Sequence, residues 1–193
     1  MHAVHVCEGI VLRKRGVGEA NVLVVILTRE LGLIRATAKS ARVEHSKLRY
    51  GLEPLTWGRF SFVRGKHEWR LTGVEQVGRV FKNVESALAR RAGKVATLLL
   101  RLIQGEEVAQ ELYKSVDEGL RALSRAPGAR EVESIESVLV LKILFHLGYL
   151  PHTEELKVFI EADFFSLELA KEVALSRARL LRAINESLQA TGL

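Results

Sequence analysis

The chain has 193 residues, of which 48% are hydrophobic, and carries a formal net charge of +6 with a single cysteine. This length and apolar content suit one large or two small globular domains, and the lone Cys7 excludes an internal disulfide bond. The longest uninterrupted apolar run, Val22–Leu27, is too short for a membrane span, and residues 1–7 lack the pattern of a secretory leader. We therefore expect a cytoplasmic protein.

The positive charge is concentrated in the first part of the chain. Residues 1–82 contain 15 Lys and Arg against 7 Asp and Glu, a net charge of +8, whereas residues 83–193 contain 14 against 16, a net charge of −2. Such an excess attracts polyanions through a long-range field. Because it also suits a plain solubility surface, charge alone leaves both interpretations open.

Short β-branched segments separated by glycines occupy the first part of the chain. In the third of them, apolar residues from Ile34 to Ala38 alternate with polar residues from Arg35 to Lys39, so one strand face can join a core while the other carries cations. The pattern predicts a five-stranded OB-fold β-barrel over residues 1–80. The predicted strands are Ile10–Leu12, Val22–Thr28, Leu33–Ala38, Leu55–Val63 and Trp69–Thr72.

Beyond Asn83 the apolar residues recur every three or four positions, which predicts an all-α domain over residues 81–193. Two amphipathic helices are expected near 88–102 and 108–123. A third, Ile135–Leu147, is apolar nearly all round and should be buried, and a last helix should run from about Leu167 to Leu188. The fold class is α+β, an OB-fold β-barrel followed by a helical domain.

The sequence contains none of the common enzyme motifs that bind phosphate or position a nucleophile. We therefore predict no enzyme, no catalytic residue and no cofactor. One acidic cluster lacks the spacing of a calcium loop and is expected to be a solvated face: Glu154, Glu155, Glu161 and Asp163. A second set lies at an expected floppy terminus without a fourth ligand, so we predict no metal there: His2, His5 and Cys7.

The basic residues of the predicted barrel favour nucleic-acid binding. OB barrels bind single strands with a cationic groove and with aromatic side chains on which bases stack. The loop containing Arg42, Lys47 and Arg49 is the best candidate for phosphate contact. The candidate DNA-binding residues are Arg13, Lys14, Arg15, Arg35, Lys39, Arg42, Lys47, Arg49, Arg64 and Lys66. Four aromatic residues could stack on bases, although at least half are expected in the core: Trp57, Phe60, Phe62 and Trp69.

At these residues the chain resembles the bacterial recombination mediator family RecO. The resemblance rests on the order and spacing of five segments within residues 8–55, and a sixth lies where that family has its central helical motif. The segments are Glu8–Arg13, Gly18–Asn21, Leu27–Ile34, Ala38–Arg42, Ser46–Arg49 leading to Leu52–Leu55, and Leu144–Pro151.

The resemblance implies an N-terminal OB barrel, a helical domain and no catalytic turnover. RecO-like proteins bind single- and double-stranded DNA, anneal complementary strands coated with single-strand-binding protein, and with RecR help to load RecA. Partners would then be DNA, RecR, the C-terminal tail of single-strand-binding protein and, indirectly, RecA, at the nucleoid and away from membranes. Lys39, Arg42, Lys47 and Arg49 match the family's basic loop, whereas Gly18 and Gly32 match its turns.

The chain departs from the family in two ways. Many members carry zinc-binding cysteines shortly after the Gly-Tyr-Leu-Pro motif, and residues 152–165 contain none, so we expect no zinc. The chain also resembles a short member with a trimmed helical domain. The resemblance also implies a pocket in the helical part for the acidic, aromatic-ended tail of single-strand-binding protein. The favoured interpretation of the last helix is an amphipathic helix packed on its neighbours, and the alternative hypothesis places the tail site on it. The residues of that candidate site are Arg177, Arg179, Leu180, Leu181 and Arg182.

Two other classes remain open at this point. The chain could be an OB-fold protein of another pathway that binds RNA or single-stranded DNA, in which case RNA would compete equally or better. It could also be a protein-interaction adaptor without strong DNA binding, whose basic front meets an acidic partner.

Overall fold

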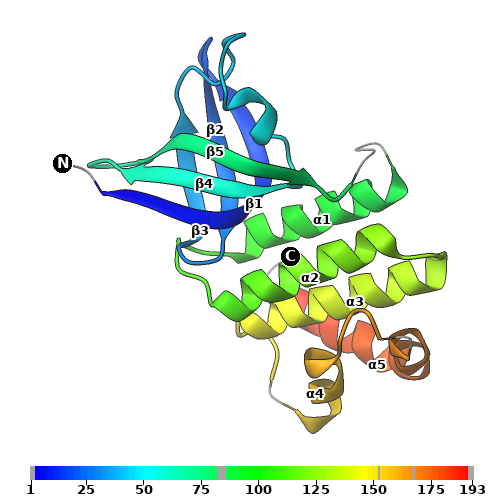
Figure 1. Cartoon of the computed structure of the whole chain (residues 1–193). Coiled ribbons are helices and arrows are strands. Elements are labelled where there is room, and N and C mark those ends of the chain that lie inside the picture. Colours follow the sequence, from blue (N-terminus) through cyan, green and yellow to red (C-terminus); the bar gives the residue numbers. More distant parts are fainter. Residues whose placement is uncertain (1–2, 82–85, 152, 167, 191–193) are drawn as a thin grey trace. The chain divides into compact units, whose positions relative to one another are not determined.

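A computed structural model describes residues 3–81, 86–151, 153–166 and 168–190. Within these ranges, five strands precede five α-helices (Figure 1). The chain divides into two compact units, one made of the described residues of 1–84 with 103–113, the other of those of 85–102 with 114–193. Residues 103–113 thus join the barrel unit, beyond the boundary near residue 80 that the sequence suggests.

The first unit is a closed five-stranded barrel. Its strands are β1 (Val4–Val17), β2 (Asn21–Thr28), β3 (Gly32–Ala38), β4 (Thr56–Arg64) and β5 (Trp69–Arg79). They follow the order β1-β2-β3-β5-β4 around the barrel, with β3 parallel to β5 and every other pair antiparallel. The predicted OB-fold barrel is confirmed, with longer first and last strands than the sequence indicates.

Strand β1 is long because it belongs to both sides of the barrel. Residues Val4–Ile10 pair with β4, and Gly9–Val17 pair with β2. Gly9 lies where the two pairings overlap, and a Cβ there would come within 2.7 Å of the Ile26 side chain. The missing side chain lets β1 pass close to β2 as it bends from one partner to the other.

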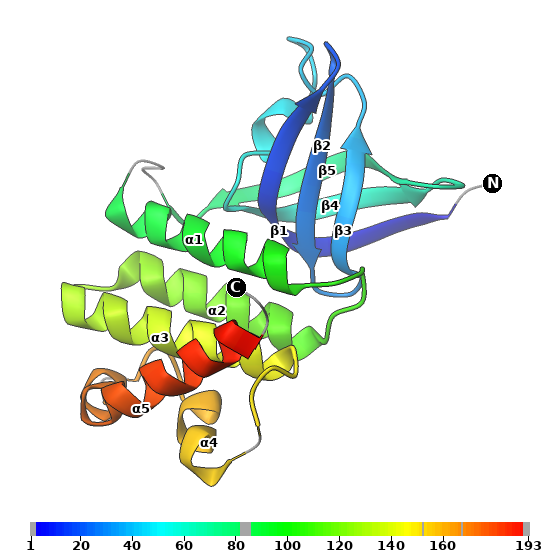
Figure 2. The same ribbon diagram turned by 180° about the vertical axis from the view of Figure 1, so that it is seen from behind.

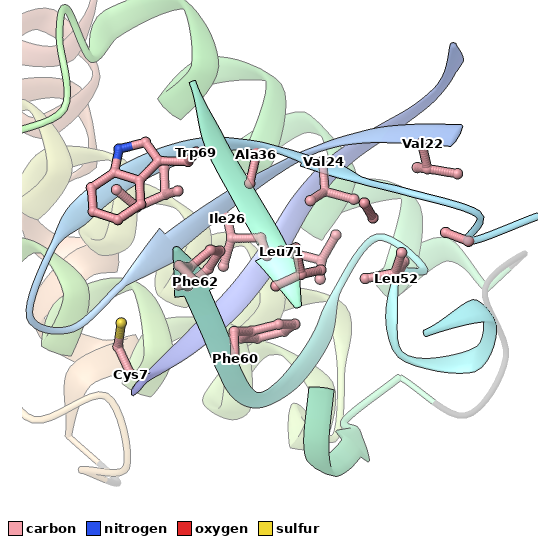
Figure 3. Packing of buried hydrophobic residues seen from close by; sticks show 14 residues of the cluster. Cys7, Val22, Val24, Ile26, Ala36, Leu52, Phe60, Phe62, Trp69 and Leu71 are labelled. Carbon is pink, nitrogen blue, oxygen red and sulfur yellow. The ribbon is translucent and has the colours of Figure 1, made fainter. Parts of the chain in front are cut away.

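The barrel core follows the alternation read in β3. Ile34, Ala36 and Ala38 are buried, whereas Arg35 is exposed. Figure 3 shows the rings of Phe60, Phe62 and Trp69 in the same cluster as Ile26 and Leu71. Alternate inward side chains from all five strands therefore fill the barrel.

The N-terminal residues form part of this core. Val4–Cys7 belong to β1, the His5 ring meets the Trp69 ring edge-on at 5.4 Å, and Cys7 is 3% exposed. Burial, aided by the Glu30 carboxylate, raises the pKa of the Cys7 thiol to about 11. The expected floppy terminus is therefore wrong for residues 4–7, because their backbone pairs with β4 and the Cys7 side chain enters the core, although Val4 and Val6 stay exposed. His2 lies outside the described residues.

The second unit is helical. Its helices are α1 (Ala87–Leu102), α2 (Gln110–Arg125), α3 (Ala129–His146), α4 (Glu154–Glu161) and α5 (Leu169–Ala190). Helix α3 contacts α1, α4 and α5 and is the central helix of this unit, and half of its residues are buried, in line with its apolar sequence. Its one buried lysine, Lys142, donates a 2.6 Å hydrogen bond to the Ala162 carbonyl oxygen and lies 4.4 Å from the Phe164 ring centre.

Helix α4 is absent from the sequence prediction. It carries Glu154, Glu155 and Glu161, which with Asp163 just beyond it are exposed. No cluster of three potential metal-ligating side chains occurs among the residues that the structure describes. Likewise, none of the helices within the described ranges has the length and apolar character needed to cross a membrane.

Candidate nucleic-acid interface

The outer face of β1, β2 and β3 carries cations in register. Because directly paired residues point to the same side of a sheet, the pairings place Arg13, Val25 and Arg35 in one row. The next row contains Arg15, Leu23 and Thr37. Figure 2 shows the three strands side by side. This face, which OB folds commonly use for oligonucleotides, is flanked by arginines on both outer strands.

Lys14 points to the opposite side of β1, toward the end of the barrel. There the loop of residues 39–55, which we call the barrel-end loop, is tied to the turn between β1 and β2. The Arg42 amide donates to the Ala20 carbonyl at 3.0 Å, and its guanidinium donates to the Gly18 carbonyl at 3.0 Å. The Ser40 amide donates to Asn21 Oδ1 at 3.0 Å. These bonds bring loop cations and Lys14 to one end of the barrel.

Most cations at this end and on the outer face are available to a ligand. Of the candidate residues here, five have exposed side chains that make no hydrogen bond or ion pair within the described residues: Arg13, Arg15, Lys39, Lys47 and Arg49. Lys14 is paired with Glu53, and Arg42 is held by Gly18. Seven of the ten candidate residues thus surround the barrel end and the adjoining β1 surface.

The other candidate residues lie toward the opposite end. Strand β5 starts at Trp69 beside Ala36 and runs parallel to β3, so the β4–β5 turn lies toward the start of β3, whereas the barrel-end loop follows its end. We call the turn, with Arg64 and Lys66, the hairpin end. The ten predicted residues therefore do not form a single site.

Gly105 and Glu106 supply the hydrogen-bonding and ionic partners of two candidate arginines, Arg35 and Arg64. The Glu106 carboxylate lies 3.9 Å from the Arg64 guanidinium and accepts a 3.2 Å hydrogen bond from the Trp69 indole nitrogen. Arg64 also lies over the Trp69 ring, 5.1 Å from its centre. Arg35 donates to the Gly105 carbonyl at 3.5 Å. Of the three candidate residues in this region, only Lys66 is exposed with no side-chain partner in the described part of the chain.

The four aromatic residues considered for base stacking are all in the core. Trp57, Phe60, Phe62 and Trp69 are each at most 6% exposed. The residue that sequence reasoning missed is Tyr50, which is 71% exposed and lies in the barrel-end loop. Tyr50 could have been identified from the sequence, because it lies outside the predicted strands and next to Arg49. An aromatic side chain in a loop between strands is less often buried in the core of a barrel.

The helical unit contains a groove of about 610 Å³ between α3 and α5, lined in part by Arg177, Leu181 and Arg130. Arg177 lies 3.2 Å from Glu133. Of the other predicted partner residues, Leu180 is fully buried and Arg179 is paired at 3.4 Å with Glu155 of α4. Arg182 is exposed outside the groove lining. Of the five predicted partner residues, only Arg177 and Leu181 line this groove, together with Arg130, which the sequence analysis did not select.

Comparisons with known proteins agree with the barrel assignment. Residues 1–79 match the family model described as Recombination protein O N terminal. The chain is 34% identical over 146 residues to the DNA repair protein RecO of Heliobacterium modesticaldum, an alignment covering 75% of this chain and 51% of that protein. It is 30% identical over 151 residues to that of Alkaliphilus metalliredigens, covering 75% and 58%.

A third relative, the DNA repair protein RecO of Thermobifida fusca, is 32% identical over 151 residues, covering 77% of this chain and 61% of that protein. The chain spans between half and two thirds of the length of these curated relatives. The OB barrel, the match of residues 1–79 and the similarity over three quarters of the chain agree, and the RecO family is the one that this protein resembles.

Proposed function

We propose that this protein is a DNA-binding mediator of DNA repair and homologous recombination whose barrel unit binds DNA. The observation that carries the proposal is the set of exposed, unpartnered cations of β1 and the barrel-end loop, described above. Cations that are not already paired within the protein can neutralise backbone phosphates and release their counterions. The relatives are named DNA repair proteins, which supports DNA as the polyanion.

In this role the protein has no catalytic step. It would bind single- and double-stranded DNA, anneal complementary strands, and with RecR help to load RecA onto strands coated with single-strand-binding protein. Backbone contacts suit such a role, because they serve any sequence and both strand states.

The test is binding to a fluorescent single-stranded oligonucleotide and to its duplex across a salt series. The variant Lys39→Gln/Lys47→Gln/Arg49→Gln removes three unpartnered cations of the barrel-end loop. If all three contact phosphates, the slope of log affinity against log salt should fall by roughly two on single strands and nearly three on duplex.

The matched control, Arg59→Gln/Arg70→Gln/Arg79→Gln, removes the same charge from exposed positions of β4 and β5. We expect it to retain most of the wild-type slope. Equal losses in the two variants would contradict a localised interface. Negligible wild-type binding at physiological salt would favour a protein-interaction adaptor, and stronger binding to a matched RNA would favour an RNA-binding role.

We further propose that the groove between α3 and α5 takes the acidic, aromatic-ended tail of single-strand-binding protein. Arg130 and Arg177 place two cations at a groove whose lining also includes Glu133, Glu136 and the half-exposed Leu181. Arg177 is 64% exposed and Arg130 has no partner among the described residues, so both can meet a carboxylate.

A tail-peptide titration by fluorescence anisotropy tests the groove. Arg130→Glu/Arg177→Glu should weaken binding strongly, whereas Arg179→Glu/Arg182→Glu, an equal charge change on α5 outside the groove lining, should change it little. The reverse pattern, or no effect of either variant on a peptide that binds the wild type, would reject this groove as the tail site.

A further inference from the structure

The end of the barrel is hollowed beneath the barrel-end loop. The hollow has a volume of about 360 Å³, and most of its exposed lining is polar. Three of its side chains are cationic and one is anionic, a net charge of +2. We call it the cationic hollow; its lining residues are Lys14, Val22, Ala41, Arg42, Arg49, Leu52 and Glu53.

The three cations differ in what already holds them. The Lys14 ammonium is paired with the Glu53 carboxylate, and one guanidinium nitrogen of Arg42 is bound to the Gly18 carbonyl. Arg49 has no side-chain partner among the described residues. The hollow therefore offers the full donor set of Arg49 and the remaining donors of Arg42 to an anion, a geometry suited to phosphate oxygens.

Tyr50 lies in the chain between two residues that line this hollow, Arg49 and Leu52. It follows Arg49 within the short helix η1 (Arg49–Gly51), and Leu52 and Glu53 of the lining come shortly after it. Gly51 and Leu52 are buried, which leaves the Tyr50 side chain at the surface with 71% of its area exposed.

The turn that carries Tyr50 is well fixed. The Arg49 amide donates to the Ser46 carbonyl at 3.2 Å, and the Gly51 amide donates to the Leu48 carbonyl at 3.2 Å. A Cβ at Gly51 would come within 2.5 Å of the Val74 side chain, so the backbone lies directly against β5. A ring on a fixed turn loses little conformational entropy when it contacts a ligand.

Exposure sets Tyr50 apart from the other large aromatic side chains of its unit. Trp57, Phe60, Phe62, Trp69, Phe81 and Tyr113, which complete the Phe, Trp and Tyr residues of its described part, are at most 8% exposed. A nucleobase approaching the described barrel surface therefore meets one such ring, and that ring belongs to the residue that follows Arg49 of the cationic hollow.

We propose that the cationic hollow and Tyr50 form a nucleotide subsite, in which an unstacked base lies on the Tyr50 ring and its phosphate is held by Arg49 and Arg42. This deepens the proposed function and rests on it. Bases of a duplex are stacked on one another and cannot lie on the ring without being extruded, whereas phosphates are available in both forms. Tyr50 thus gives the barrel end a preference for single strands.

The test compares Tyr50→Ala, Tyr50→Phe and Arg49→Gln in the full chain, each titrated with a deoxythymidine oligomer and with a duplex across a salt series. Tyr50→Ala should weaken single-strand binding by roughly 5- to 150-fold, the range for one lost base stack, with an unchanged salt slope. Tyr50→Phe should retain the wild-type affinity, and duplex binding should change less than twofold in both. Arg49→Gln should lower the slope on both substrates by about one.

A second readout follows the ring itself. Trp57 and Trp69 are buried, so a Tyr50→Trp variant adds one exposed indole whose fluorescence should be quenched by the oligomer but not by the duplex. Three results would overturn the subsite: unchanged single-strand affinity in Tyr50→Ala, an equal loss of affinity for the duplex, or quenching that does not distinguish the oligomer from the duplex. The proposed function would still hold if the wild type binds DNA in a salt-dependent way. Absence of wild-type DNA binding would overturn both.

Discussion

The two ends of the barrel contain the same kinds of residue in opposite states. At the loop end, Arg49 is exposed without a partner among the described residues and Tyr50 is exposed beside it. At the hairpin end, Arg64 lies over the buried Trp69, and both meet Glu106. An arginine next to an aromatic residue is therefore exposed and open to a ligand at one end and part of the packing at the other, because only the second pair is contacted by Glu106.

The largest expected difference between the ends is in stability. Trp69→Ala removes a ring that is 5% exposed in the barrel core and should lower the free energy of unfolding by about 3–5 kcal/mol. Tyr50→Ala removes an exposed ring and should change it by no more than about 0.5 kcal/mol. Urea unfolding of both variants measures the contrast; comparable losses would show that Tyr50 is a packing residue.

A second difference should appear at high pH. Cys7 shares the core cluster of Trp69, and burial raises the pKa of its thiol from 9.0 to about 11. As pH rises, the unfolded chain loses this proton first, so the associated stability is complete below pH 9 and falls as pH approaches 11. At pH 10 the loss should be about 1.4 kcal/mol.

Urea unfolding of the wild type and of Cys7→Ala at pH 8 and pH 10 isolates this effect, because other titrating groups are common to both proteins. The wild type should lose more stability than the variant. Parallel losses in the two proteins would mean that the thiol ionises as readily in the folded barrel as in the unfolded chain.

The smallest expected effect concerns the charge that Glu106 neutralises. Glu106→Gln keeps an oxygen that can accept from the Trp69 indole but removes the negative charge near Arg64. If Glu106 is what withholds Arg64 from DNA, the salt slope of DNA binding should steepen by up to about one. The control is Glu107→Gln, which removes the same negative charge from the next residue, whose side chain is exposed. If Glu106→Gln leaves the salt slope unchanged, or changes it no more than Glu107→Gln does, Arg64 has a structural role and does not contact DNA.

The sequence predicted the elements well where the periodicity was strong. The alternation in β3 and the three- and four-residue spacing of α1 and α2 reflect burial of one face, and the structure confirms these elements. Helix α4 was missed because its 8 residues include three carboxylates and two buried positions, Leu156 and Phe159, too few for a clear period. The first strand was underestimated because His5 and Glu8 interrupt its apolar residues.

By itself, the amino-acid sequence determined the barrel, the helical unit and the concentration of positive charge in the first 82 residues, because these follow from local periodicity and composition. Which cations are available and which ring is exposed depended on tertiary contacts. Lys14 meets Glu53 across 39 positions, and Trp69 meets Glu106 across 37. These pairs form because the folded barrel unit brings distant segments of the chain together, and local sequence patterns contain no information about such contacts.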